Sequence, residues 1–124
     1  MIILDTDVLI EIFDKGSTKG DDAIAKIEEI GEDIAITSIN LHEIQYGIHK
    51  FGKKKIKELD LLATFEFNGT DAKLSAKLEL ECERKGTPVS RIDSMIAAIA
   101  INRKTRIFTF NKKHFQSFSK LKLI

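Results

Sequence analysis

The stretch "SRIDSMIAAIAINRKTRIFTF", residues 90–110, contains both kinds of element that the rest of the chain repeats. After Asp93 there is hardly a polar side chain for two helical turns, which predicts a helix over residues 90–104 that is more buried than any other in the chain. "RIFTF", residues 106–110, is a short run that predicts a strand. An apolar helix followed at once by a strand is an order typical of α/β proteins.

The same alternation continues toward the N-terminus. "MIILD" (residues 1–5) and "DIAITS" (33–38) are continuous apolar runs that suit parallel strands buried on both faces, and the more polar "TFEFNG" (64–69) suits a sheet edge. Other predicted elements are a loop at 16–20, helices at 6–15, 21–32, 39–51 and 70–86, a further helix or a continuation at 53–63, and a last edge strand at 120–124. The alternation predicts an α/β fold: a three-layer α/β/α sandwich with a mainly parallel central sheet, formed as one domain by residues 1–124.

Composition excludes some classes of protein. The chain is 43% hydrophobic and 31% charged, an ordinary globular mix, and its net charge of +1 neither favours nor excludes a nucleic-acid partner. Cys82 is the one cysteine, so an internal disulfide is excluded, and its spacing from Leu74 and Leu78 indicates a core thiol in a reducing cytoplasm. "MIILDTD" does not read as a signal peptide, and no apolar run approaches the ~20 residues of a membrane span, so we expect no membrane association.

Polar side chains from distant parts of the sequence are expected to meet at one rim of the sheet. Asp5 ends the first strand, Glu43 lies in the helix after the second strand, Asp93 opens the buried helix, and Thr109 and Asn111 lie at the end of the strand at 106–110. In a parallel sheet the carboxyl ends of the strands point the same way, and ligands bind beyond them. The sequence therefore predicts a polar site at this rim.

Each acid also has a simpler interpretation. Asp5 could cap the helix that follows it, Ser90 and Asp93 fit a reciprocal capping box, and Glu43 could be a surface side chain. Gly47, one turn after Glu43, costs about 1 kcal/mol inside a helix relative to Ala, which we interpret as a sign that something approaches closely beside Glu43.

The charge of the expected site favours a divalent cation. Three carboxylates brought within several ångströms repel one another, so one would hold a proton unless a cation were bound. Asp5, Glu43 and Asp93 offer hard oxygen ligands, which suit Mg²⁺ or Mn²⁺, and no cluster of Cys and His offers a zinc site. Asp7 either lines the same site or stabilises the first turn of its helix.

Four segments of the chain form an ordered set: "IILDTDVLIEI" (2–12), "AITSINLHEIQYGI" (35–48), "PVSRIDSMIAAIAI" (88–101) and "IFTFNKKHF" (107–115). In order and spacing they resemble the motif blocks of PIN domains, and most closely those of VapC-type toxins from toxin–antitoxin pairs. The resemblance implies a PIN-like α/β/α sandwich and an endoribonuclease dependent on Mg²⁺ or Mn²⁺ that leaves a 5′-phosphate and a 3′-hydroxyl. It also implies a homodimer held inactive by a VapB-like antitoxin whose tail enters the active groove.

The resemblance also assigns roles to individual residues. The family's first, second and third acids fall on Asp5, Glu43 and Asp93, which are then the expected metal ligands and catalytic residues. Thr109 matches a hydroxyl that positions water or phosphate. Asn111 belongs to the same catalytic set.

The last block departs from the family's pattern. Many members carry a fourth acid there, whereas this chain has Asn111 at one acidic position and His114 at the other. An amide oxygen can hold a metal or its water but adds no charge, so we expect weaker metal binding. His114 either contacts RNA or is a plain surface residue.

Basic residues supply the other half of an expected RNA site. Arg91 and Lys112 each neighbour an expected site residue and are the expected phosphate contacts. The lysine-rich run at 53–57 is interpreted as a solvated surface.

Two other functions remain open on the sequence alone. "DTDVLI" approaches the DxDx[TV] start of haloacid-dehalogenase phosphatases, with Asp5 as the nucleophile, but Leu9 occupies the place of Thr or Val. The missing fourth acid also permits a catalytically weak or inactive PIN fold that binds RNA or protein.

Overall fold

Four parallel strands form the central sheet in the order β3-β2-β1-β4. The computed structural model describes the whole chain, residues 1–124. The strands are β1 (Ile2–Leu4), β2 (Ile34–Thr37), β3 (Ala63–Phe65) and β4 (Arg106–Phe108). The most apolar run, β1, lies between β2 and β4 and is fully buried, whereas the more polar β3 forms an edge, as its sequence predicts.

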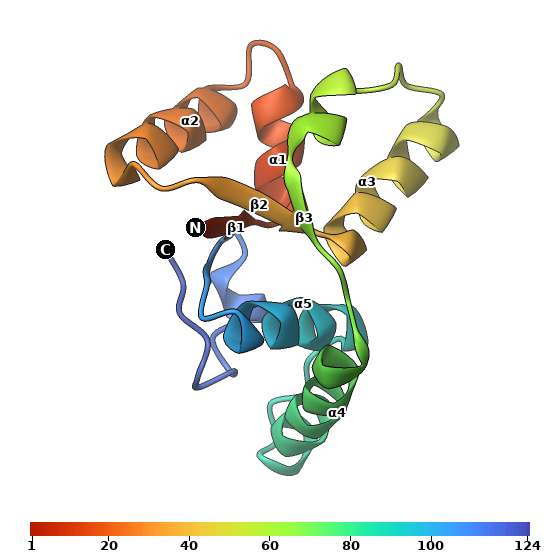
Figure 1. Cartoon of the computed structure of the whole chain (residues 1–124), viewed down its shortest axis with the longest axis vertical. Helices are drawn as coiled ribbons and strands as arrows, with labels where there is room; N and C mark the ends of the chain where they lie inside the picture. The colour runs from red at the N-terminus through yellow and green to blue at the C-terminus, as the bar shows by residue number, and fades with distance from the viewer.

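Helices cover both faces of the sheet (Figure 1). On one face lie α1 (Thr6–Phe13), α2 (Thr18–Ile30) and α3 (Ser38–Phe51), and on the other lie α4 (Gly69–Arg84) and α5 (Arg91–Asn102). The short 3₁₀ helices are η1 (Lys57–Leu61) and η2 (Lys112–His114). This arrangement confirms the predicted three-layer sandwich with a parallel sheet.

Alternate residues of the strands feed two separate cores. Ile3 and Ile107 pack with α4 and α5, and Ile2, Leu4 and Ile36 pack with the helices of the opposite face. The apolar run of α5 is buried from Ile96 to Ala100, which confirms that this helix lies against the sheet. No helix has the length and hydrophobicity that crossing a membrane would take.

Three local predictions were wrong. The expected helix at 53–63 is only the 3₁₀ helix η1, because Gly52 ends α3 in a left-handed conformation and the lysines that follow bury no apolar face. The expected last strand at 120–124 makes one isolated bridge, between Leu123 and Ile107. Helix α2 starts at Thr18, inside the expected loop, because Ser17 caps it by accepting a hydrogen bond from the Gly20 amide.

Gly20 lies where α1 and α2 touch. A Cβ atom at Gly20 would stand 2.1 Å from the carbonyl oxygen of Glu11 and 2.7 Å from its carbonyl carbon. The two backbones therefore approach more closely than any side chain allows, so this position requires glycine.

We expect Gly20→Ala to lower the free energy of unfolding by about 2 kcal/mol, because overpacking at a rigid contact typically costs about 1–3 kcal/mol. Urea unfolding followed by circular dichroism measures the change. A Gly20→Ala protein as stable as the wild type would show that the two helices can separate freely.

Gly47 is the matched control. A Cβ atom at Gly47 meets no atom of the chain within 4 Å, so no part of the folded chain approaches closely there. Gly47→Ala should instead raise the free energy of unfolding by about 1 kcal/mol through helix propensity alone.

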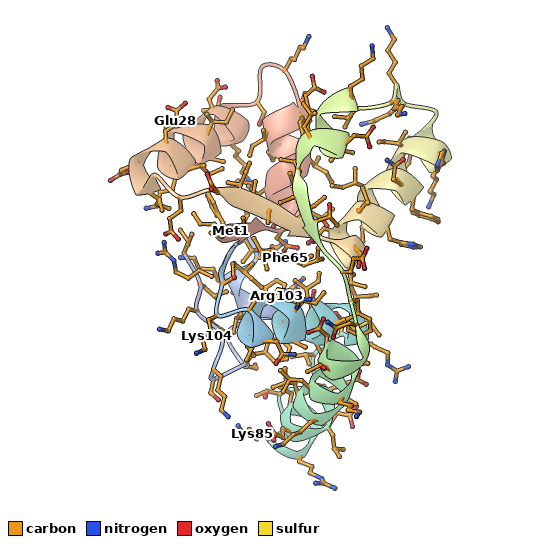
Figure 2. The ribbon with its side chains drawn as sticks, viewed as in Figure 1. Met1, Glu28, Phe65, Lys85, Arg103 and Lys104 are labelled. Carbon is orange, nitrogen blue, oxygen red and sulfur yellow. The ribbon has the colours of Figure 1, made fainter.

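A buried ion pair fastens α4 to α5. The Asp71 carboxylate is 1% exposed and accepts hydrogen bonds from Nη1 of Arg103 at 3.0 and 3.1 Å and from Nδ2 of Asn102 at 2.8 Å. Arg103 also donates to the Glu66 carbonyl at 2.9 Å, and its guanidinium lies 5.3 Å from the ring centroid of Phe65 at the end of β3 (Figure 2). The pair thus ties both helices of one layer to the edge of the sheet.

Candidate active site

Asp5 is the centre of the polar site at the carboxyl end of β1. It caps α1, and its Oδ1 accepts hydrogen bonds from the Thr6 amide at 2.9 Å and from Nδ2 of Asn40 at 3.2 Å. Its Oδ2 accepts from the Thr109 hydroxyl at 2.9 Å. The capping interpretation and the strand-end interpretation are therefore compatible, because different oxygens of one carboxylate serve the helix and the neighbouring strand end.

Asp7 turns toward the segment that follows β4. Its Oδ2 accepts hydrogen bonds from the Phe110 amide at 3.1 Å and from Nδ2 of Asn111 at 3.0 Å, and the Thr109 hydroxyl lies 3.5 Å away. Its Oδ1 is buried and has no hydrogen-bond partner. A buried carboxylate oxygen without a donor is costly, so this atom marks a place suited to a bound cation or donor.

Glu43 joins the site through one shared hydroxyl. Thr6 Oγ1 donates to Glu43 Oε1 at 2.7 Å and accepts from Nδ2 of Asn40 at 3.0 Å. Asn40 is fully buried, and its Oδ1 accepts from both the amide and the hydroxyl of Thr37, which orients its Nδ2 toward Asp5 and Thr6. The start of α3 thus fixes the hydrogen-bond chain that links Asp5 to Glu43.

Asp93 lies on the other side of the segment that follows β4. Its amide donates to the Ser90 hydroxyl at 3.0 Å. The expected capping box also requires the Asp93 carboxylate to accept a hydrogen bond from the Ser90 amide, and this bond does not form. The carboxylate, 19% exposed, instead has Oδ2 3.6 Å from Nδ1 of His114 in η2. Because η2 follows Asn111 directly, Asp93 contacts the same segment that contacts Asp7.

Burial raises the pKa of two carboxylates of the site, those of Asp5 and Asp7. Burial, followed by the nearby charge of Asp7, raises the pKa of Asp5 to about 6, while hydrogen bonds from Thr109 and Thr6 oppose the rise and the charge of Glu43 adds to it. Burial also raises the pKa of Asp7. The charge of Asp7 therefore raises the pKa of Asp5 more than the charge of Glu43 does.

The raised pKa of Asp5 predicts a pH-dependent stability. Because the folded state holds this proton more tightly than the unfolded state, stability is lost as pH rises from about 4 through about 6 when no cation is bound. Asp5→Asn removes this loss. In EDTA we expect the variant to gain about 2 kcal/mol over the wild type at pH 7 and little at pH 4.

Urea unfolding of both proteins at the two pH values measures this difference. Comparing variant with wild type cancels the opposite contribution of carboxylates such as Asp71, whose pKa is lowered because the hydrogen bonds from Arg103 and Asn102 outweigh its burial. If the difference in unfolding free energy between variant and wild type does not change with pH, Asp5 is not the cause of the pH-dependent loss of stability.

The donor set suits a hard divalent cation, although the expected three acids do not form a closed cluster. No three side chains of Asp, Glu, His or Cys are close enough to hold an ion by themselves, because the Thr6 hydroxyl stands between Asp5 and Glu43 and His114 faces Asp93. Asp5 and Asp7 nevertheless flank one hydroxyl, both carry raised pKa values, and one buried oxygen lacks a donor. Such a pair fits Mg²⁺ or Mn²⁺ with water completing the coordination.

The expected phosphate contacts differ in availability. The Arg91 guanidinium makes two hydrogen bonds to Glu79 on α4, at 3.1 and 3.2 Å, and so is held by the chain itself. Lys112 makes no ion pair and lines a groove that begins at Thr109 and Asn111. Of the two, Lys112 is the one free to meet a phosphate.

Three residues have a larger part in the site than the sequence predicts. The sequence also explains Asp7 as a first-turn acid, and it predicts no role in the site for Thr6 or Asn40. The one local signal was that Asn40 lies three residues before Glu43, on the same side of its helix.

Comparison with known proteins places the chain in a family. The PIN domain family model matches residues 2–121. Ribonuclease VapC2 of Rickettsia felis is 33% identical over 94 residues, which are 71% of this chain and 70% of the relative. The chain therefore belongs to the PIN domain family.

Solved structures show which members of that family the chain resembles. VapBC2 from Rickettsia felis, bound to a DNA fragment from their promoter, matches with a TM-score of 0.79 and 29% identity over 100% of this chain and 98% of that one. FitAcB from Neisseria gonorrhoeae matches with a TM-score of 0.83 over 100% and 96% of the two chains, and at 19% identity it shows the fold alone. Within the PIN family the chain is of the VapC type, as its sequence blocks predict.

Proposed function

We propose that the chain is a metal-dependent endoribonuclease, the toxin of a VapBC-type pair, that hydrolyses phosphodiester bonds of RNA. The observation that carries this proposal is the convergence of Asp5 and Asp7 on the Thr109 hydroxyl, with Glu43 joined to them through Thr6. Two partly buried acids with raised pKa values, Asp5 and Asp7, at the carboxyl end of a parallel strand suit a cation that must meet a phosphate. The similarity to a VapC ribonuclease supports RNA as the substrate.

Each residue has a role that follows from its contacts. Asp5, Asp7, Glu43 and Asp93 would hold Mg²⁺ or Mn²⁺, which when bound supplies an acidified water and stabilises the charge that develops on the phosphate. Thr109 orients the Asp5 carboxylate through its 2.9 Å hydrogen bond. The buried network behind these groups limits their movement, so little reorganisation is needed during the reaction.

Asn111 and Lys112 complete the site on the side of β4. The Asn111 amide donates to Asp7 at 3.0 Å, so it orients a carboxylate without adding charge. This arrangement supports weaker cation binding than a fourth acid would give. Lys112 is exposed beside it and is suited to hold a substrate phosphate.

The partners follow from the family and from one apolar surface. We propose a VapB-like antitoxin as the partner, since VapBC2 is a complex of this type. A groove of about 380 Å³ between α1 and α3, lined by apolar side chains that include Ile10, Ile48 and Phe51, has Glu43 in its wall and suits an antitoxin tail. A homodimer and action in a reducing cytoplasm, where the buried thiol of Cys82 would stay free, complete the proposal.

The test is cleavage of RNA by the purified protein. Single-stranded and structured RNA are incubated with Mn²⁺ or Mg²⁺, and the fragments are separated on a gel and analysed for 5′-phosphate ends. We expect cleavage with either cation and none after EDTA is added. Binding without cleavage in both cations would favour a non-catalytic module, which the amide at Asn111 makes the second candidate. Phosphate release from a small phosphoester in place of RNA cleavage would indicate a phosphatase.

A further inference from the structure

A basic groove runs beside the candidate active site, between α2 and the segment after β4. Its volume is about 720 Å³, and Thr109 and Asn111 form part of its wall. The other polar and aromatic residues that line it are Asp22, Lys26, Phe108, Phe110, Lys112, Lys113 and His114. The groove therefore starts at residues that contact Asp5 and Asp7 and leads away from them.

The charge of this groove favours a polyanion. Lys26, Lys112 and Lys113 are exposed, and none of them makes an ion pair within the chain, so three ammonium groups face one carboxylate, that of Asp22. By contrast, Arg91 is paired with Glu79. Free cations next to a site suited to phosphodiester cleavage are the groups expected to contact the backbone of the substrate.

Phe110 gives the groove an aromatic surface. The residue is 37% exposed, and its ring makes an edge contact with that of Phe108, at 5.9 Å between centroids and an interplanar angle of 83°. The ammonium group of Lys19 lies 5.7 Å from its centroid. The Phe110 amide donates to Asp7, so the residue that carries this ring also contacts the candidate active site.

We infer that this groove binds one arm of a single-stranded RNA, with an unpaired base on the Phe110 ring and backbone phosphates on Lys26 and Lys112. The inference rests on the proposed ribonuclease function and names the form of RNA that the site takes. A base can stack on an aromatic side chain only when it has left its own stack, so a duplex cannot make the same contact. Because Phe110 also contacts Asp7, a base held there places the neighbouring phosphodiester beside the carboxylates.

Fluorescence anisotropy with a short labelled RNA tests the inference. Every protein carries Asp5→Asn, so that the RNA is not cut, and the same RNA is used single-stranded and annealed to its complement. Phe110→Leu should weaken binding of the single strand about tenfold and leave binding of the duplex unchanged, since a base on an aromatic ring contributes about 1–3 kcal/mol. Tyr46→Leu is the matched control, because Tyr46 is an exposed aromatic on α3 outside this groove.

Salt dependence tests the phosphate contact separately. Lys26→Gln should reduce the slope of log Kd against log salt concentration by about 0.7, the change expected for one lost phosphate contact on a single strand. Lys77→Gln, an exposed lysine on α4, should leave the slope unchanged.

The inference is overturned if the Phe110→Leu protein binds the single strand as tightly as the Tyr46→Leu protein does. It is also overturned if the slope of log Kd against log salt concentration is the same for Lys26→Gln and Lys77→Gln. Cleavage by the protein without Asp5→Asn is measured in parallel with Mn²⁺. Cleavage with no effect of the groove variants overturns the inference and leaves the ribonuclease standing. The expected groove effects without cleavage support the binding mode and contradict the ribonuclease.

Discussion

Asp5→Asn is expected to lower the rate of RNA cleavage about 100-fold or more and to leave the fold intact. Loss of a residue that merely supports a metal ligand costs about 10–100-fold in affinity or activity, so loss of a central carboxylate should cost at least as much. The oxygen of Asn can still accept the hydrogen bond from the Thr6 amide, which preserves the cap of α1. Its NH₂ group takes the place of the oxygen that accepts from Thr109, and it can donate to that hydroxyl instead. Initial rates of cleavage with saturating Mn²⁺ measure the effect.

Two further variants test whether the loss of cleavage is specific to Asp5 and its hydrogen-bond partner. Asp60→Asn changes an exposed carboxylate of η1 and should cleave RNA at the wild-type rate. Thr109→Val removes the hydroxyl that donates to Asp5 and should lower the rate by an intermediate factor of about 10–100. An Asp5→Asn protein that cleaves as fast as Asp60→Asn would remove Asp5 from the reaction.

Asp71→Ala is expected to cause the largest loss of stability. It removes the buried partner of Arg103 and leaves the guanidinium and the Asn102 amide without their acceptor. Breaking a buried pair on one side typically costs about 3–5 kcal/mol, and we expect about 3 kcal/mol because Arg103 keeps its contacts to the Glu66 carbonyl and the Phe65 ring. Urea unfolding measures the loss.

Glu79→Ala is the matched control for this prediction. Glu79 also lies on α4 and pairs with an arginine at the start of α5, but that arginine, Arg91, is exposed. Exposed ion pairs contribute little, so the change in stability should be much smaller than that of Asp71→Ala. Equal losses in the two variants would show that the burial of Asp71 is not the cause of its effect.

The layers of the fold could be predicted from the sequence because each rests on a local pattern. The apolar runs of β1 and β2 indicate strands covered on both faces, and the apolar run of α5 indicates a helix against the sheet. The approach of Thr109 to Asp5 follows from the same reasoning, since parallel strand ends share one edge. The catalytic roles of these residues remain predictions.

The remaining details depend on contacts between segments distant in sequence. The contacts of Asp7 could not be predicted because its position in the first turn of α1 explains a carboxylate locally, whereas its partners, Phe110 and Asn111, lie at the other end of the chain. Gly20 resembled a loop residue, and only the nearby backbone of Glu11 shows why glycine is required. At Gly47, by contrast, no other part of the chain approaches, so packing within the chain does not explain the glycine.

Calorimetric titration with Mn²⁺ tests most directly whether these acids hold a cation. The wild type and Asp60→Asn should bind Mn²⁺ with the same affinity, and Asp5→Asn should bind it at least about tenfold more weakly. A wild-type protein that does not bind Mn²⁺, or an Asp5→Asn protein that binds it as tightly as Asp60→Asn, would contradict a metal centre built on Asp5.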